Sequence, residues 1–273
     1  MTIKTVAFIG AGLIGAPMAR RVQAAGFDLT VCDRNPSVLN AFKAEGAKVT
    51  LSVADCATTD AVIILLANDA QIEDTMLGDN GLVQAIPDGH KPIICMMSTT
   101  LPDTLKLLKQ ALDADIEAVT PLMQSMGERI FHCGPLGAGE VTKVINNMLC
   151  VANMYLTAEA IDLAQRHGVS FEKLSPILAV STGMNFLTVD AQTGREQYHA
   201  WGGPEQDFVA TYNNIITKDL HLALKLAEQA DVELGLLKNA SEYADAAKAD
   251  PRVAERWKRI GDAWPKRMPG DGV

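Results

Sequence analysis

A lysine and an asparagine, Lys143 and Asn147, stand four residues apart in a stretch that is otherwise mostly apolar. Residues with this spacing lie on one face of a helix. Burial disfavours the charged form of a lysine, so an amine in such surroundings is suited to give or take a proton near neutral pH. Asn147 can both donate and accept hydrogen bonds, and could therefore orient a substrate oxygen. The alternative is structural: Lys143 reaches solvent along its methylene stem or pairs with Glu140, three residues before it.

A glycine-rich turn, GAGLIG at residues 10–15, lies near the start of the chain. The GxGxxG spacing is weak evidence alone, but this turn follows a strand pattern, opens a helix pattern and precedes an acidic residue, Asp33, by about 20 residues. Gly10 would permit the tight turn, Gly12 the approach of a pyrophosphate, and Gly15 the packing of helix against strand. The N–H groups at the helix start would bind the phosphates. The alternative is a strand–helix–strand unit that binds no dinucleotide.

The residues after the second predicted strand bear on the choice of dinucleotide. Asp33 can accept hydrogen bonds from both ribose hydroxyls of NAD and would repel the 2′-phosphate of NADP. Arg34 could instead hold that phosphate. Because Asp33 occupies the discriminating position, the sequence predicts NAD as the cofactor, with NADP as the alternative.

The elements that position these residues follow from the apolar patterns. Strands are expected at Lys4–Ile9, Phe27–Cys32, Asp60–Leu66 and Pro92–Met97. Helices are expected at Leu13–Ala25, at Pro36–Ala44 with Asn35 as N-cap, and at Pro102–Leu112. Alternating strands and helices predict an N-terminal Rossmann-type, doubly wound parallel sheet, covered on both faces.

The second half has no strand pattern and predicts an all-α domain. Gly139–His167 reads as one long helix with apolar residues all around it, as in a buried helix. Further helices are expected at Phe171–Val180, Phe208–Ala230 and Leu234–Ala247. The predicted domains are therefore 1–138, which binds the dinucleotide, and 139–273, which serves substrate binding and oligomerisation. The final stretch, Asp250–Val273, is expected to pack loosely on the surface.

Composition excludes several other classes of protein. The chain has 273 residues, 24 Lys and Arg against 33 Asp and Glu, and a net charge of −9, which argues against binding to nucleic acid or to anionic membranes. Five cysteines without a CxxC pair predict reduced, buried thiols, and five scattered histidines predict no metal site. No run of 18 apolar residues is present, so the sequence predicts a soluble, cytoplasmic protein.

Several sequence blocks resemble the β-hydroxyacid dehydrogenase family, which includes the 3-hydroxyisobutyrate, threonate, glycerate (tartronate semialdehyde) and 6-phosphogluconate enzymes. The opening FIGAGLIGAPMARRV (8–22) resembles the start of that family, and GPLGAGEVTKVINN (134–147) resembles the beginning of its catalytic helix. The resemblance implies that Lys143 is the general acid/base and that Asn147 orients the substrate. It also implies a homodimer or homotetramer.

The same resemblance extends the predicted cofactor site. LLAND (65–69) resembles the loop that lies against the cofactor, STT (98–100) the segment near the nicotinamide ribose, and STG (181–183) a turn of the helical domain. Phe208 with KDL (218–220) resembles a late motif whose lysine reaches the active site and the cofactor. The predicted cofactor-binding residues are Gly10, Gly12, Leu13, Ile14, Gly15, Asp33, Arg34, Leu66, Ala67, Asn68, Thr99 and Lys218.

One part of the family pattern is not found. The family carries a substrate-binding DAPVSGG segment and then a GTL strand before the catalytic helix, whereas here Asp115–Met123 reads as the following helix and Ile130–His132 as the last strand. The gap, near 112–116, amounts to about 30 residues at usual strand and loop lengths. Either the molecule has residues that this sequence omits, or it carries a true deletion. Omission is favoured, because deleting interior strands would leave apolar edges unpaired.

The resulting prediction is hydride transfer between NAD and a small β-hydroxyacid of the 3-hydroxyisobutyrate, threonate or glycerate type. Lys143 would take the hydroxyl proton in oxidation and return it in reduction. Two alternatives stay open. The chain could bind NAD(P) without dehydrogenase activity because the substrate loop is missing. It could also reduce imines on the same architecture, although Lys143 stands where hydroxyacid chemistry needs a proton donor.

Overall fold

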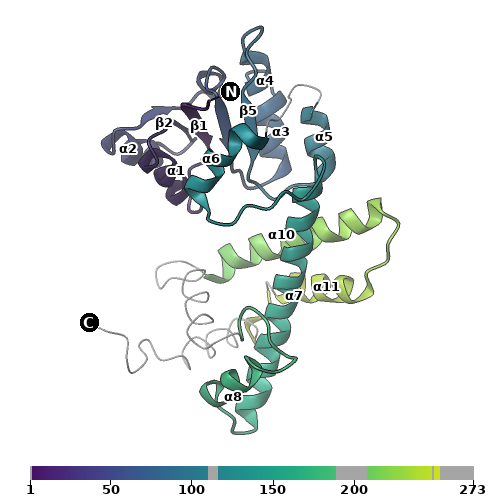
Figure 1. The fold of residues 1–273 in the computed structure, drawn as a ribbon. Coiled ribbons are helices and arrows are strands. Elements are labelled where there is room, and N and C mark those ends of the chain that lie inside the picture. Colours follow the sequence, from purple (N-terminus) through teal and green to yellow (C-terminus); the bar gives the residue numbers. More distant parts are fainter. Residues whose placement is uncertain (1, 110–115, 189–207, 248, 253–273) are drawn as a thin grey trace, which may run out of the picture. The chain divides into compact units, whose positions relative to one another are not determined.

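The computed structural model describes residues 2–109, 116–188, 208–247 and 249–252 (Figure 1). The chain divides into two compact units, Met1–Thr142 and Lys143–Val273. Helix α7 (Ala138–Arg166) is continuous through that division, so the boundary predicted between residues 138 and 139 stays a prediction. The gap predicted near 112–116 falls largely on residues 110–115, outside the described part of the chain.

The first unit contains one parallel sheet of five strands, in the order β3-β2-β1-β4-β5. The strands are β1 (Thr5–Ile9), β2 (Asp28–Cys32), β3 (Lys48–Thr50), β4 (Ala61–Ile64) and β5 (Ile93–Met96). Ile9, at the end of β1, pairs with Cys32 on one side and with Ile64 on the other. The strand order reverses between β1 and β4, and the carboxyl edge at such a point is where doubly wound sheets bind ligands. The predicted fold class is confirmed.

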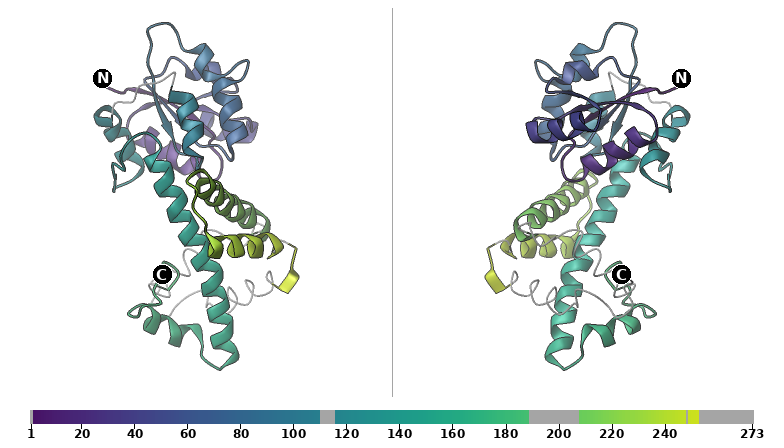
Figure 2. Two further views of the ribbon diagram at one scale, coloured as in Figure 1. Left: turned by 90° about the vertical axis from the view of Figure 1, so that its right-hand side faces the viewer. Right: turned by 90° about the vertical axis from the view of Figure 1, so that its left-hand side faces the viewer.

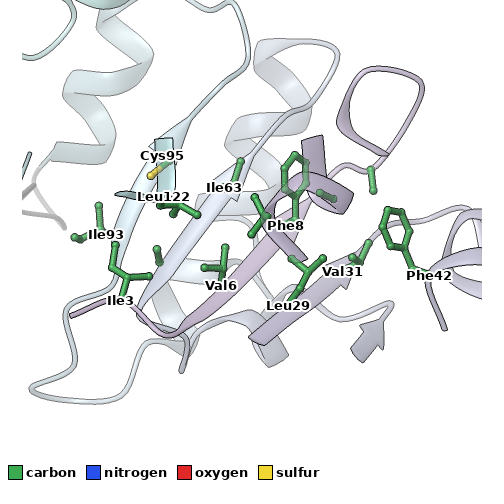
Figure 3. Close-up of a cluster of buried hydrophobic side chains, with 14 of the residues drawn as sticks. Ile3, Val6, Phe8, Leu29, Val31, Phe42, Ile63, Ile93, Cys95 and Leu122 are labelled. Carbon is green, nitrogen blue, oxygen red and sulfur yellow. The ribbon is translucent and has the colours of Figure 1, made fainter. Parts of the chain in front are cut away.

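Helices cover both faces of this sheet, as the two views of Figure 2 show. On one face, Val6, Phe8 and Ile63 pack toward α1 (Gly15–Ala24), α2 (Pro36–Ala44) and α6 (Ile116–Met126) (Figure 3). On the other face, Ala7, Ile9 and Ile64 pack toward η1 (Val53–Cys56), α3 (Asp69–Leu77), α4 (Leu82–Ala85) and α5 (Pro102–Lys109). Strands buried on both sides have no polar face, which explains their unbroken apolar runs.

Helix ends follow local signals. Asn35 caps α2 by accepting a hydrogen bond from the Ser37 N–H, with Pro36 in the first turn, as predicted. Asn68 caps α3 in the same way, by accepting from the Gln71 N–H. α1 begins at Gly15, two residues later than predicted, because Leu13 and Ile14 belong to the turn.

The predicted strand at Ile130–His132 is wrong. These residues have no regular structure, and Phe131 is 77% exposed. In the described part of the chain, β5 is an edge strand that pairs only with β4, so residues 130–132 do not add to the sheet at its open edge. The nearby Cys133 is also exposed, against the prediction of buried thiols, whereas Cys32, Cys56 and Cys95 are buried and free as predicted.

The described part of the second unit is helical, with α8 (Phe171–Leu178), α10 (Phe208–Gln229) and α11 (Gly235–Ala247) besides α7. α10 and α11 lie side by side (Figure 1). Tyr155 of α7 meets Tyr243 of α11 edge to face, with 5.5 Å between ring centroids. The Asn185 side chain donates to the Thr157 hydroxyl and so fixes the 181–188 turn region against α7.

One face of α7 is exposed, which corrects the prediction of a helix buried all around. Val151, Met154, Ala158 and Ile161 are buried, but an opposite set of large apolar side chains is not. This exposed apolar stripe consists of Ile145, Leu149, Leu156 and Leu163, which are 46–66% exposed. Their spacing places them along one side of the helix. The described residues of a single chain therefore do not bury this stripe, although the apolar sequence pattern of α7 predicts that it is buried.

No helix within the described ranges is long and apolar enough to cross a membrane.

Asp60 fastens the start of β4 to the start of β1. Its carboxylate accepts hydrogen bonds from the N–H groups of Lys4 and Thr5, both at 2.8 Å, and from the Thr5 hydroxyl at 2.9 Å. Burial raises the pKa of Asp60, but the hydrogen bonds from Thr5 and Lys4 together outweigh it, and the pKa lies below its usual value. When the pKa of a carboxyl group is lower in the folded state than in the unfolded chain, its ionised form stabilises the folded state. This contribution is present at higher pH and is lost as the pH falls through the folded-state pKa.

We expect Asp60→Asn to reduce the free energy of unfolding at pH 7. The difference from wild type should persist down to about pH 4, the unfolded value for Asp. It should then shrink as the pH falls through the lower folded-state pKa, because the wild-type carboxylate becomes protonated there. Urea unfolding across this pH range measures the difference. Asp79→Asn, at an exposed site, is the control, and a difference for Asp60→Asn that does not change with pH contradicts the expectation.

Candidate functional site

The glycine turn after β1 is required by close backbone contacts. Gly10 has a φ of +92°, and a Cβ there would stand 2.2 Å from the Leu65 carbonyl oxygen. A Cβ on Gly15 would stand 2.2 Å from the Gly10 carbonyl oxygen. Both distances are far below contact, so neither position accepts a side chain without a backbone shift. Gly10 and Gly15 therefore hold the turn closed between β1, β4 and α1.

Gly12 differs from its neighbours, because a Cβ there would meet nothing within 4 Å. Its lack of a side chain is not explained by packing within the chain, and it leaves open space directly over the turn. Ile14 occupies the N-cap position of α1 and provides no side-chain cap, so the first-turn N–H groups have no side-chain acceptor there. Open space beside uncapped N–H groups fits a pyrophosphate. The residues present thus fit a dinucleotide.

Asp33 and Arg34 follow β2 at the same edge of the sheet. The Asp33 Oδ1 accepts a hydrogen bond from the Asn35 N–H at 2.8 Å, which fixes the carboxylate while its other oxygen stays available. The Arg34 Nη2 lies 2.7 Å from the Oδ2 of Asp74, in the second turn of α3. Asp74 was not predicted from the sequence, since only the fold brings it next to Arg34.

The loops after β4 and β5 are joined at this edge. The Leu66 N–H donates to the Ser98 hydroxyl at 2.7 Å, and the Thr100 hydroxyl donates to Asp69. The Ala67 N–H donates to the Gln71 side chain at 3.1 Å. These contacts give the loops a fixed form, and they also commit the Asn68 side-chain oxygen to capping α3. The Asn68 side chain therefore has a structural task that the sequence analysis missed.

The first unit thus brings most of the predicted cofactor residues to one edge, because each follows the carboxyl end of a parallel strand. These residues are Gly10, Gly12, Leu13, Ile14, Gly15, Asp33, Arg34, Leu66, Ala67, Asn68 and Thr99. Leu13 and Ile14 are 66% and 60% exposed. Their side chains therefore lie outside the core.

In the second unit, two of the three remaining predicted residues, Asn147 and Lys218, lie against a buried carboxylate. Asn147 of α7 donates from Nδ2 to the Oδ2 of Asp219 on α10, at 2.8 Å. Asp219 is 5% exposed, and its other oxygen lies 3.5 Å from the Nζ of Lys218 without a hydrogen bond within the described residues. Asp219 belongs to the KDL block but received no role from the sequence. Its position directly after Lys218 is the feature of the sequence that could have indicated a role for it.

Lys143 lies one turn before Asn147 and is exposed, with no carboxylate of the described residues at ion-pair distance. The pairing with Glu140 offered as an alternative is therefore not seen, and neither is the apolar burial that the pattern suggested.

The thiol of Cys150, one turn beyond Asn147, has a pKa that depends on the charges near this part of α7. Burial raises the pKa of its thiol, the charge of Lys143 acts to lower it, and that of Asp219 to raise it. The charges of Lys143 and Asp219 thus act on the Cys150 thiol in opposite directions.

Family models match most of the chain in two consecutive parts. Residues 5–121 match the NAD binding domain of 6-phosphogluconate dehydrogenase. Residues 137–255 match a domain described as NAD-binding of NADP-dependent 3-hydroxyisobutyrate dehydrogenase. The first match contains the glycine turn and the second contains Lys143, Asn147 and Lys218.

Known proteins resemble the chain over most of its length. An NAD-dependent L-serine dehydrogenase of Pseudomonas aeruginosa is 31% identical, over 83% of this chain and 86% of the relative. A 3-hydroxyisobutyrate dehydrogenase of the same species is 29% identical, over 85% of this chain and 89% of the relative. A solved structure of Mycobacterium tuberculosis 3-hydroxyisobutyrate dehydrogenase with L-serine has a TM-score of 0.73 at 20% identity, and covers 95% of this chain and 99% of that one. The last likeness shows the fold.

The parallel sheet and its glycine turn define an NAD(P)-binding protein with a Rossmann-type domain followed by a helical one. The similarity to the serine and 3-hydroxyisobutyrate enzymes narrows this class. The chain belongs to the β-hydroxyacid dehydrogenase family. It is an NAD(P)-dependent hydroxyacid dehydrogenase, as the sequence resemblance implied.

Proposed function

We propose that this protein oxidises a small β-hydroxyacid with NAD and that Lys143 is the general acid/base. The observation that carries the proposal is the group on α7 and α10, in which Lys143 and Asn147 share a helix face and Asp219 holds the Asn147 amide. The Asn147 Oδ1 also accepts from the Asn146 Nδ2 at 3.2 Å. An amide held at both ends keeps its second N–H and its second acceptor position in a set direction, which orientation of a substrate requires.

Each residue of this group has a separate task in the proposed reaction. Bound nicotinamide supplies the hydride acceptor. Lys143, with Nζ unprotonated, takes the proton of the substrate hydroxyl during oxidation, and in reduction the protonated amine returns it to the forming alkoxide. Asn147 holds a substrate oxygen in position while Asp219 fixes the amide. Lys218 supplies positive charge, which suits the carboxylate end of a β-hydroxyacid.

The preference for NAD over NADP rests on Asp33. Its carboxylate, fixed by the Asn35 N–H, stands after β2, where the adenosine ribose lies in this type of fold. A fixed carboxylate accepts from ribose hydroxyls and repels a phosphate at the same place. We infer that NAD is the working cofactor.

The substrate class and assembly belong to the same proposal. The relatives named for L-serine and 3-hydroxyisobutyrate support a three- or four-carbon hydroxyacid, in line with a 3-hydroxyisobutyrate-, threonate- or glycerate-like substrate. The exposed apolar stripe of α7 supports a homodimer or homotetramer, because a large uncovered apolar face favours association.

One observation favours a second candidate, a dinucleotide-binding protein without turnover. The alignment with the Pseudomonas 3-hydroxyisobutyrate dehydrogenase runs over 273 positions but covers only 85% of this chain, so the relative has residues with no counterpart here. The exposed Ile130 and Phe131 lie in the stretch before the helix of Lys143. A missing substrate loop would spare the glycine turn and impair catalysis.

An activity screen beside a binding titration separates the two candidates. The screen follows NADH and NADPH formation with L-serine, 3-hydroxyisobutyrate, glycerate and threonate, and the titration follows cofactor fluorescence. We expect turnover of at least one acid, with kcat/KM about tenfold or more higher for NAD than for NADP, a difference of about 1.4 kcal/mol. Tight NADH binding without turnover of any acid would support the second candidate, and turnover of cyclic imines alone would indicate imine reduction.

A further inference from the structure

The ion pair between Arg34 and Asp74 lies at the cofactor edge of the sheet and has no part in the reaction proposed above. We propose that Asp74 is a second determinant of cofactor choice, which holds the Arg34 guanidinium away from the 2′-phosphate of NADP. This inference deepens the proposed function and rests on its NAD preference. It concerns the binding of the dinucleotide, so a test does not depend on turnover.

The pair joins elements on the two sides of β1. Arg34 follows β2, which pairs with one side of β1, whereas α3 follows β4, which pairs with the other. The guanidinium Nη2 and the carboxylate Oδ2 are 2.7 Å apart. The contact therefore extends along the carboxyl edge near the switch between β1 and β4, next to the carboxylate of Asp33.

The charges at this edge disfavour an added phosphate. A free arginine offers a planar fork that binds phosphate in a bidentate manner. In this structure one arm of the fork, Nη2, donates to Asp74, and Asp33, the residue before Arg34, adds a second negative charge at this edge. A 2′-phosphate brings roughly −1.5 to −2 charges near neutral pH. It would have to compete with Asp74 for a bidentate approach to Arg34 and lie near two carboxylates.

The exposure of the pair argues against a mainly stabilising role. The side chains of Arg34 and Asp74 are 80% and 62% exposed, and solvent-exposed pairs contribute little to the free energy of folding. Removing Asp74 should therefore leave the first unit folded. The pair between Arg20 and Glu45, which joins α1 to the end of α2, provides a matched surface control in the same unit.

The test is fluorescence titration of the whole protein with NADH and with NADPH. The set comprises wild type, Asp74→Asn, Arg34→Ala, the double variant and Glu45→Gln. We expect Asp74→Asn to tighten NADPH binding about threefold to fivefold and NADH binding less than twofold, since an exposed pair is worth up to about 1 kcal/mol, a factor of about five. Arg34→Ala alone should change NADPH binding less than twofold, and in the Asp74→Asn background it should remove the gain. Glu45→Gln should leave the ratio of the two dissociation constants unchanged.

Two results would overturn the role of Asp74. In the first, Asp74→Asn tightens NADH and NADPH equally or changes neither, which leaves only a general charge effect. In the second, Arg34→Ala alone weakens NADPH binding strongly, which means that Arg34 already serves the phosphate while paired. Failure of the wild type to bind NADH would overturn the proposed cofactor preference itself, whereas NADH binding with unchanged selectivity overturns only the role of Asp74.

Discussion

Replacement of Lys143 by alanine is expected to lower kcat for hydroxyacid oxidation by about 10²- to 10⁴-fold, the usual contribution of a positioned general acid/base. The dissociation constant for NADH should stay within about twofold of wild type, because the glycine turn and Asp33 belong to the first unit. Steady-state kinetics with the substrate found in the screen and NADH titration measure the two effects. Loss of turnover with intact binding is the signature of a residue that acts on the proton.

A matched control separates this effect from simple loss of positive charge. Lys225 is exposed on α10 in the same unit, so Lys225→Ala removes one charge from the same domain without touching the proposed group. Its kcat should remain near wild type. A general base also gives the rate a dependence on pH that vanishes when the base is removed. A Lys143→Ala enzyme with near-normal turnover, or with the wild-type pH profile at reduced rate, would refute the assignment.

The sheet was predictable because its strands carry a strong local signal. β1, β4 and β5 are short, almost wholly apolar runs, β2 alternates apolar with polar residues, and the glycine turn marks where the first strand ends. The short β3 (Lys48–Thr50) and the helix α3 (Asp69–Leu77) were missed. β3 has three residues with one apolar side chain, and α3 carries few apolar residues in a regular repeat. Such elements are stabilised by packing and hydrogen bonds to neighbouring strands and helices, and their own sequence carries little signal for them.

Side-chain partners were the part that the sequence could not supply. Arg34 and Asp74 are 40 residues apart and Asn147 and Asp219 are 72 apart, and only the fold makes either pair adjacent. A residue type indicates what a side chain can bind, and topology decides what it does bind. The predicted strand at Ile130–His132 failed for the related reason that a strand forms only when it pairs with a neighbour, and in the described residues β5 pairs with β4 alone.

The glycine turn allows cofactor binding to be separated from folding. Gly12→Ala should weaken NADH binding at least tenfold, since a Cβ there enters the space that a pyrophosphate would occupy. Its free energy of unfolding should equal that of wild type or exceed it by up to about 1 kcal/mol, because alanine restricts the unfolded chain. Gly15→Ala should instead lose about 3 kcal/mol or more, as its Cβ would meet the Gly10 carbonyl oxygen at 2.2 Å.

Urea unfolding and NADH titration of both variants distinguish these roles. If Gly12 served packing alone, Gly12→Ala would bind NADH normally or unfold together with Gly15→Ala. The open space over Gly12 and the closed contact at Gly15 predict opposite results from the same change of glycine to alanine. Gly12 lies in the turn and Gly15 begins α1, and both changes add one methyl group, so the main expected difference between them is what each methyl meets. For Gly15 that is the backbone of the protein, and for Gly12 it is the open space where the proposed dinucleotide would bind.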